Sequence, residues 1–202
     1  MNDLMRYASD LAGVTGEGGV PNNLDKWDPP FCGDIDLVIR SDGTWAYCGT
    51  PIGRARLVRL FSTVLRKEDD KYFLVTPVEK LGITVEEAPF LAVLVRAERE
   101  RNMRDQPQRL VFTTNVGDEV VVDADHGLCY RERPDPSGER GTESAPYLHV
   151  RSGLEALVAR SVVFDLVDLG EQRHINGLEW FGVSSCGVFF PFAPASDING
   201  LR

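Results

Sequence analysis

The centre of the chain is a succession of short apolar segments, and this feature restricts the fold more than any other. Between residues 82 and 133, five segments rich in Val, Ile, Leu, Phe and Tyr are each bounded by Gly, Pro, Asn or Asp. Their sequences are GITVE, FLAVLVRAERE, QRLVFTTNVG, DEVVVDAD and LCYRER. Segments of this length between turn-forming residues are typical of β-strands joined by short loops. The central part of the chain is therefore predicted to be sheet.

Two longer segments have the spacing of amphipathic helices. The first predicted helix covers residues 51–66, with Thr50 as its cap and Pro51 at its first position. Its apolar residues gather on one arc of the helical wheel: Leu57, Val58, Phe61, Val64 and Leu65. The second covers residues 151–169 and begins at Arg151. Strands and helices do not alternate regularly, so the sequence favours an α+β fold rather than a parallel sheet.

The order of these segments predicts two small, structurally related α+β domains, each a sheet packed with one long helix. An N-terminal helix and linker are expected over residues 1–30, the first domain over 31–82 and a strand-rich second domain over 83–202. Both helices begin with the pattern R-x-x-L-x-x-L, at Arg54 and at Arg151. The shared pattern and the apolar strand after each helix suggest an internal duplication.

Charge and composition exclude several classes of partner. The formal net charge is −9, which disfavours binding to nucleic acid and to anionic membrane surfaces. No apolar run reaches the roughly 18 residues that a membrane-spanning helix needs, and the first residues lack the pattern of a secretory signal. The four cysteines form no C-x-x-C pair, so reduced, buried thiols in a cytoplasmic protein are expected.

Arg54 is the first candidate ligand-binding residue. It falls in the first turn of the predicted helix and on its apolar arc. A cation there opposes the helix dipole at a cost of about 0.3–1 kcal/mol. In one interpretation, a carboxylate or phosphate of a ligand is held by Arg54 and the free N–H groups of the helix. In the other, Arg54 forms an internal salt bridge with an acidic residue such as Asp34, Asp36 or Glu79.

Arg151 is predicted to lie in the first turn of the second helix, as Arg54 does in the first helix. If a rough two-fold relates the domains, the two arginines converge on one anion-binding cleft. Aromatic residues on the neighbouring strands either offer rings on which a flat group stacks or fill the core. The predicted ligand-binding residues are Arg54, Arg151, Thr50, Gly53, Trp45, Tyr47 and Trp180, and no cofactor or metal is predicted.

Catalytic motifs are missing from the sequence. There is no P-loop, and GVSSCG places Cys186 where a nucleophile elbow needs glycine. The only acid–histidine cluster runs from Asp123 to His126, and it predicts either metal ligands or a turn. The leading hypothesis is a non-catalytic module for a small anionic or nucleotide-like ligand. The alternatives are a protein-interaction adaptor, or a hydrolase acting through Asp123, His126 or Cys186.

Residues 42–90 resemble the signature block of the bacterial family DUF1285. The motifs D-G-x-W, G-x-P-I-x-R, L-V-R-L-F and L-V-T-P-V-E-K are all present. The resemblance implies two similar α+β domains, the second similar to a pleckstrin-homology fold. It also implies a site between the domains for a small nucleotide-like ligand and a part in bacterial signalling, without an established enzymatic activity.

Overall fold

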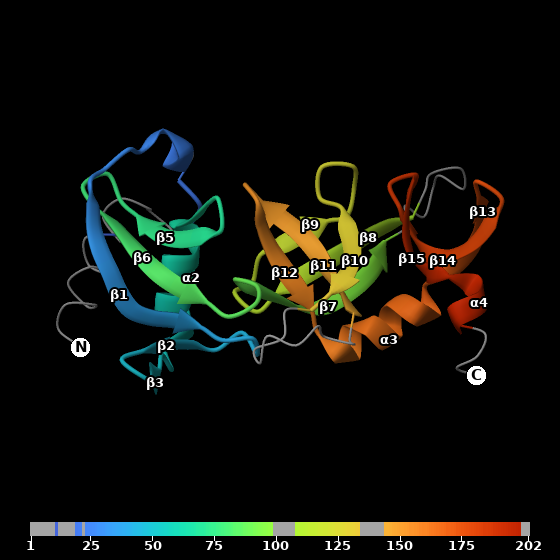
Figure 1. Ribbon diagram of the computed structural model, residues 1–202, viewed down its shortest axis with the longest axis horizontal. Coiled ribbons are helices and arrows are strands. Elements are labelled where there is room, and N and C mark those ends of the chain that lie inside the picture. The colour runs from blue at the N-terminus through green and yellow to red at the C-terminus, as the bar shows by residue number, and fades with distance from the viewer. Residues whose placement is uncertain (1–10, 12–18, 22, 99–107, 134–143, 199–202) are drawn as a thin grey trace. The chain divides into compact units, whose positions relative to one another are not determined.

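The computed structural model describes residue 11 and residues 19–21, 23–98, 108–133 and 144–198 (Figure 1). The chain divides into two compact units, residues 1–89 and 90–202, and each is described by itself. Both units consist mostly of strands with few helices. The helix expected within residues 1–30 lies largely outside the described residues. Within the described ranges, no helix has the length and apolar character needed to cross a membrane.

Over residues 23–89, unit 1 consists of one six-stranded sheet and one α-helix. The helix is α2 (Ala55–Thr63), and a short 3-10 helix, η1 (Leu24–Lys26), precedes the first strand. The strands are β1 (Phe31–Ile39), β2 (Trp45–Tyr47), β3 (Thr50–Pro51), β4 (Leu65–Glu68), β5 (Lys71–Val75) and β6 (Lys80–Val85). Their order across the sheet is β3-β2-β1-β6-β5-β4.

The described residues of unit 2 form a six-stranded sheet, a three-stranded sheet and two helices. The larger sheet consists of β7 (Phe90–Glu98), β8 (Arg109–Thr114), β9 (Glu119–Val121), β10 (Leu128–Glu132), β11 (Ser144–Arg151) and β12 (Leu154–Val158), in the order β10-β11-β12-β7-β8-β9. The smaller sheet consists of β13 (Glu171–Ile175), β14 (Leu178–Ser185) and β15 (Val188–Pro194). The helices are α3 (Arg160–Asp168) and α4 (Ala195–Ile198).

The two six-stranded sheets share one topology. Each consists of two antiparallel three-stranded meanders, and its first and last strands pair in parallel to join them. The helices do not follow this correspondence, because α2 comes after the third strand of its sheet and α3 after the sixth. The predicted equivalence of Arg54 and Arg151 at two helix starts is therefore wrong.

Alternation along the strands of unit 1 directs one face of the sheet toward α2. Trp45 and Ile39 are paired across β2 and β1, and both are almost fully buried. The indole of Trp45 stacks on the ring of Phe61 from α2, with centroids 6.5 Å apart and planes at 22°. Leu37 and Leu74 are also buried completely. The helix and this face of the sheet thus form the core of unit 1.

The first predicted helix is too long at its start. Thr50 and Pro51 form β3, an edge strand paired with β2, and the helix begins only at Ala55. Proline suits an edge strand because its missing N–H removes no ladder hydrogen bond there. Thr50 therefore does not cap the helix, and Arg54 occupies the N-cap position instead.

The same helix also ends earlier than predicted. The hydroxyl groups of Ser62 and Thr63 donate to the carbonyls of Arg59 and Leu60, both over 2.7 Å. Such side-chain hydrogen bonds compete with the backbone pattern of a helix. The chain then enters β4, so the segment after Val64 is strand rather than helix.

The second predicted helix is mostly strand. Ser152 and Gly153 have positive φ angles of 43° and 74° and form the turn between β11 and β12. The following apolar run, residues 154–158, pairs in parallel with β7. A short apolar run fits a buried strand and a buried helix equally well, and here sheet pairing decides between them. Only α3 remains helical.

Candidate functional site

Arg54 stands immediately before α2. Its backbone is extended, with φ −94° and ψ 98°, and its carbonyl accepts the N–H groups of Leu57 and Val58 over 2.9 and 3.2 Å. The residue is exposed, so the prediction that it lies on the apolar arc of the helix is wrong. The helix begins at Ala55 rather than at the predicted Pro51, and this places Arg54 outside its amphipathic pattern.

The start of α2 is electropositive. It has no side-chain cap and no acidic residue in its first turn, where Arg56 is exposed beside Arg54. The backbone N–H groups of Ala55 and Arg56 donate to no acceptor in the described part of the chain. Gly53 adds open space, because a Cβ built there meets no atom within 4 Å. Such a helix start suits a phosphate or carboxylate group.

Arg151 ends strand β11 in unit 2 and does not open a helix. Its Nη1 donates to Asp118 Oδ2 over 2.7 Å, and its guanidinium lies 5.0 Å from the centre of the Phe90 ring. The side chain is only 19% exposed. Contacts within unit 2 therefore position this arginine.

The three aromatic candidates have different environments. Trp45 is 2% exposed and packed on Phe61, which favours the core-filling interpretation. Tyr47 is half-buried on β2 in unit 1, whereas Trp180 is half-buried on β14 in unit 2. A stacking role is thus open to Tyr47 and Trp180 but not to the buried ring of Trp45.

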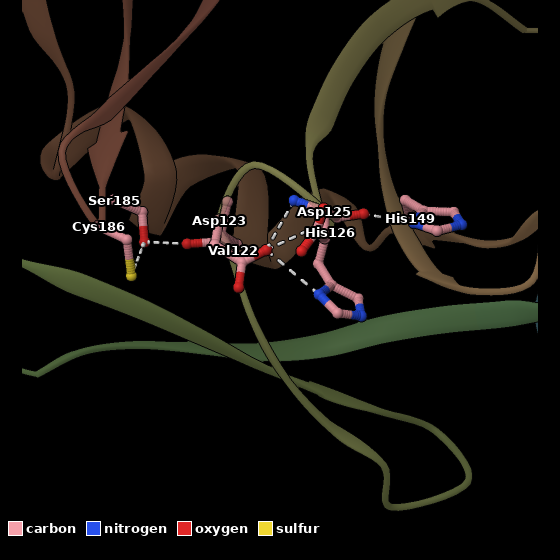
Figure 2. Close-up of polar contacts among 7 residues, drawn as sticks. All are labelled: Val122, Asp123, Asp125, His126, His149, Ser185 and Cys186. Carbon is pink, nitrogen blue, oxygen red and sulfur yellow. Dashed lines mark hydrogen bonds and ion pairs between the residues drawn. The ribbon is translucent and has the colours of Figure 1, made fainter.

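A polar cluster in unit 2 contains the residues that a hydrolase would use (Figure 2). The Ser185 hydroxyl donates to the carbonyl of Val122 over 2.6 Å and accepts the N–H of Leu110 over 2.9 Å. Ser185 is completely buried, so these bonds tie the smaller sheet of unit 2 to the larger one. Cys186 is half-buried in the following turn. The serine has a structural environment rather than that of a nucleophile.

Asp123 forms the turn that follows β9 (Figure 2). Its Oδ1 accepts the backbone N–H groups of Asp125 and His126 over 2.9 and 2.8 Å and lies 3.2 Å from His126 Nδ1. The backbone hydrogen bond from His126 is the largest cause that holds the pKa of Asp123 below its ordinary range. The residues that the structure describes contain no group of three or more His, Cys, Asp or Glu side chains suited to a metal ion. The turn interpretation is the one that fits.

Sequence reasoning missed the part that His149 plays beside this turn. Its Nδ1 lies 2.8 Å from the carbonyl of Asp125, and its Nε2 accepts the N–H of Gly153 over 3.2 Å. The ring also stacks near His126, with centroids 5.9 Å apart. Strand pairing brings His149 next to the turn at Asp125 and His126, so no spacing in the sequence predicts this contact.

A second missed feature is a cavity of about 230 Å³ on the sheet of unit 1. Its lining includes Asp34, Asp70, Lys71, Phe73, Gly82 and Thr84, which come from β1, β5, β6 and the turn before β5. From the sequence, Asp34 is a candidate only as a salt-bridge partner of Arg54. The cavity depends on the register between β1 and β6, which no local sequence signal gives.

The cysteines also differ from the prediction. Cys32, Cys48 and Cys129 are exposed and Cys186 is half-buried, so the expectation of four buried thiols is wrong. All four are free. The short strands and tight turns that carry them leave most of these thiols at the surface.

Comparisons with known proteins agree on one family. Residues 22–88 match the family model "Domain of unknown function (DUF1285), N-terminal domain", and residues 89–192 match "Protein of unknown function (DUF1285), C-terminal domain". The chain is similar to a crystal structure of a DUF1285 family protein from Silicibacter pomeroyi DSS-3, with 43% identity, a TM-score of 0.81 and 97% of each chain covered.

A DUF1285 family protein from Shewanella baltica OS155 is 30% identical over 65% of this chain and 89% of its own, with a TM-score of 0.46. The comparison with curated proteins finds no match. The two family models together span most of the sequence, and the Silicibacter pomeroyi structure covers nearly all of it. The chain belongs to the DUF1285 family.

Proposed function

We propose that this protein is a non-catalytic module that binds a small anionic or nucleotide-like ligand at the start of α2. The observation that carries the proposal is the local chemistry of this helix start. It is uncapped, lacks an acidic residue in its first turn and is flanked by the exposed Arg54 and Arg56. The positive end of the helix dipole and the two arginine side chains all attract an anion at this place.

The geometry favours a small group over a polymer. A phosphate or carboxylate can accept from the backbone N–H groups of Ala55 and Arg56 while Arg54 supplies a bidentate guanidinium. Thr50 on the neighbouring edge strand is exposed and offers a hydroxyl. The net charge of −9 repels a long polyanion, so we assign the site to a small ligand. We assign the output of binding to a signalling response rather than to turnover of the ligand.

The environment of the polar groups in unit 2 supports the non-catalytic half of the proposal. Ser185 is buried and hydrogen-bonded as both donor and acceptor. The Asp123 carboxylate accepts backbone N–H groups of its own turn. A hydrolase that acts through Asp123 would need this carboxylate to be available for substrate or as a catalytic base.

A thermal-shift panel tests the proposal with inorganic phosphate, sulfate, AMP and ADP as probes. A ligand at 100 times its Kd stabilises the folded state by about 2.7 kcal/mol. We expect at least one probe to raise the melting temperature of the wild type, and Arg54→Ala to abolish the shift. Arg59→Ala is the matched control, because this exposed arginine lies further along the same helix. A shift that survives Arg54→Ala, or a panel without any shift, overturns the assignment.

A protein-interaction adaptor is the second candidate. Phe164 and Val167 lie one turn apart on α3 and are 64% and 46% exposed. Two neighbouring apolar side chains on a helix surface are suited to a partner's apolar groove. A partner that binds the wild type with measurable affinity and loses binding to a Phe164→Ser/Val167→Ser variant supports this function. Equal affinity for both proteins excludes this surface.

A further inference from the structure

We propose that the sheet of unit 1 carries a second binding site, for a small organic cation with a primary ammonium group, in the cavity beside Asp34. This site goes beyond the proposed function, since it takes a ligand of the opposite charge and does not use the start of α2. Its evidence is the cavity itself, the row of residues beneath it and the charges around it.

The cavity lies on the face of the sheet opposite α2. Arg66, Phe73, Gly82 and Asp34 are paired in turn across β4, β5, β6 and β1, so their positions share one face. Leu74, the neighbour of Phe73 in β5, is fully buried and belongs to the other face. The row thus crosses the sheet on the side that the helix leaves uncovered.

Gly82 gives the Asp34 carboxylate its place on this row. A Cβ at position 82 would lie 1.9 Å from Asp34 Oδ1 and 3.1 Å from its Cγ. The carboxylate therefore rests directly over the glycine backbone, in space that any side chain would fill. A side chain at position 82 would displace the exposed Asp34 carboxylate, and with glycine there this anionic group lies at the wall of the cavity.

The charges around the cavity favour a cation. Its lining contains the carboxylates of Asp34 and Asp70, the ammonium of Lys71 and the hydroxyl of Thr84. Two negative groups and one positive group leave a net charge of −1. In the described part of the chain, the Asp34 carboxylate has no hydrogen-bond or ion-pair partner. An ammonium ligand would supply donors for this carboxylate and partly neutralise the lining.

The neighbouring residues already hold an ammonium group in the proposed manner. Lys80 Nζ lies 5.0 Å from the centre of the Phe73 ring and 2.9 Å from Glu68 Oε2. An aromatic ring and a carboxylate together thus bind the lysine ammonium at this face. Phe73 and Asp34 also line the cavity, where the Phe73 ring is shared with Lys80 and with the ring of Phe31, whose centroid lies 6.1 Å away.

The size of the cavity limits the ligand. A volume of about 230 Å³ corresponds to roughly eight water molecules at about 30 Å³ each. It is smaller than the pockets of about 300–1,000 Å³ that hold drug-sized ligands. A short aliphatic diamine or amino alcohol fits this volume, with its carbon chain along the Phe73 ring and its ammonium on Asp34.

Isothermal titration calorimetry with 1,4-diaminobutane tests the site on the full chain. The uncharged 1,4-butanediol and the dianion succinate serve as probes of equal chain length. We expect the wild type to bind the diamine at millimolar concentrations or below and to bind neither analogue at this site. Asp34→Asn keeps the shape of the side chain and should weaken diamine binding at least about tenfold.

Asp36→Asn is the matched control, because this exposed acid lies on the same strand but does not line the cavity. We expect its affinity to stay within about twofold of the wild type, since it removes the same charge from the chain. Gly82→Ala is a second test: its added Cβ displaces the Asp34 carboxylate, and circular dichroism verifies its fold.

Three results would overturn the proposal. The first is a wild type that does not bind the diamine. The second is an unchanged affinity in Asp34→Asn, and the third is an equal loss in Asp36→Asn, which would mean general attraction to an acidic protein. Failure here leaves the anion site at α2 untouched, because Arg54→Ala tests that site with probes of the opposite charge.

Discussion

Replacement of Ser185 by alanine should destabilise unit 2 far more than the loss of one hydroxyl group suggests. The hydroxyl bridges two backbone groups, the N–H of Leu110 and the carbonyl of Val122, over 2.9 and 2.6 Å. Ser185, Leu110 and Val122 are all completely buried, so water does not replace the missing partner. Ser185→Ala leaves one donor and one acceptor unsatisfied inside the protein.

The magnitude follows from these two orphaned groups. Each buried unsatisfied group costs about 1–3 kcal/mol, which gives an expected total of about 3 kcal/mol for the pair. In a unit of about one hundred residues, 1 kcal/mol moves the melting temperature by at least about 4 °C. We therefore expect the melting temperature of unit 2 to fall by about 12 °C.

Two assays separate this effect from a general loss of stability. Urea unfolding followed by fluorescence in a Trp27→Phe/Trp45→Phe background reports on unit 2 through Trp180, since the two replaced tryptophans belong to unit 1. Amide hydrogen exchange reports directly on the Leu110 N–H, which should exchange at least about tenfold faster in the variant. Ser184→Ala is the control, because the Ser184 hydroxyl hydrogen-bonds to Glu171 at the surface.

A loss below about 1 kcal/mol, with unchanged exchange at Leu110, would refute this reasoning. It would mean that the hydroxyl does not join the two sheets of unit 2 as the geometry indicates.

Three further outcomes are expected from other parts of the molecule. Arg66→Ala should cost about 1.5–3 kcal/mol and expose η1 to limited proteolysis, because Arg66 Nη1 donates to the Trp27 carbonyl over 2.7 Å and its side chain is 12% exposed. The carboxyl of Asp123 should titrate below its ordinary pKa of 3.8 by NMR. Because its folded pKa is lowered, its contribution to stability is present above that value and disappears as the pH falls through the folded pKa. Ellman's reagent should modify three thiols rapidly and the half-buried fourth slowly; four slow thiols would contradict the exposed positions.

The sequence predicted those parts of the fold that depend on local signals. An Asp-Gly pair is a local turn signal, and in the structure Asp42 and Gly43 lie between two antiparallel strands, with a positive φ of 81° at Gly43. The five central apolar segments correspond to β6, β7, β8, β9 and β10. The motifs of residues 42–90 identified the family, which the comparisons confirm.

The errors arose where tertiary pairing overrides local periodicity. The apolar run of β12 has helical spacing, but its parallel partner β7 makes it a strand. The Ser152-Gly153 turn was a readable signal against a helix that begins at Arg151. The repeated R-x-x-L-x-x-L pattern favoured a helix at both places. In the structure its first copy lies at the start of helix α2, and its second copy lies at the turn between strands β11 and β12.

The candidate sites were predictable to different degrees. Arg54 was found because an arginine before an amphipathic segment is a local feature. The cavity beside Asp34 was not, since it depends on a pairing with Gly82 that joins residues 48 positions apart. No helix or strand period relates two such residues, and only the assembled sheet brings the carboxylate over the glycine.

The most direct test of the anion site is an NMR titration of the isotopically labelled full chain with ADP and inorganic phosphate. We expect the amide resonances of Ala55 and Arg56 to shift in a saturable manner, because their N–H groups point to the proposed ligand. Arg54→Ala should weaken the response at least about tenfold, and Arg59→Ala should leave it within about twofold. Unmoved resonances at these two amides, or an equal response in Arg54→Ala, would contradict the proposed function.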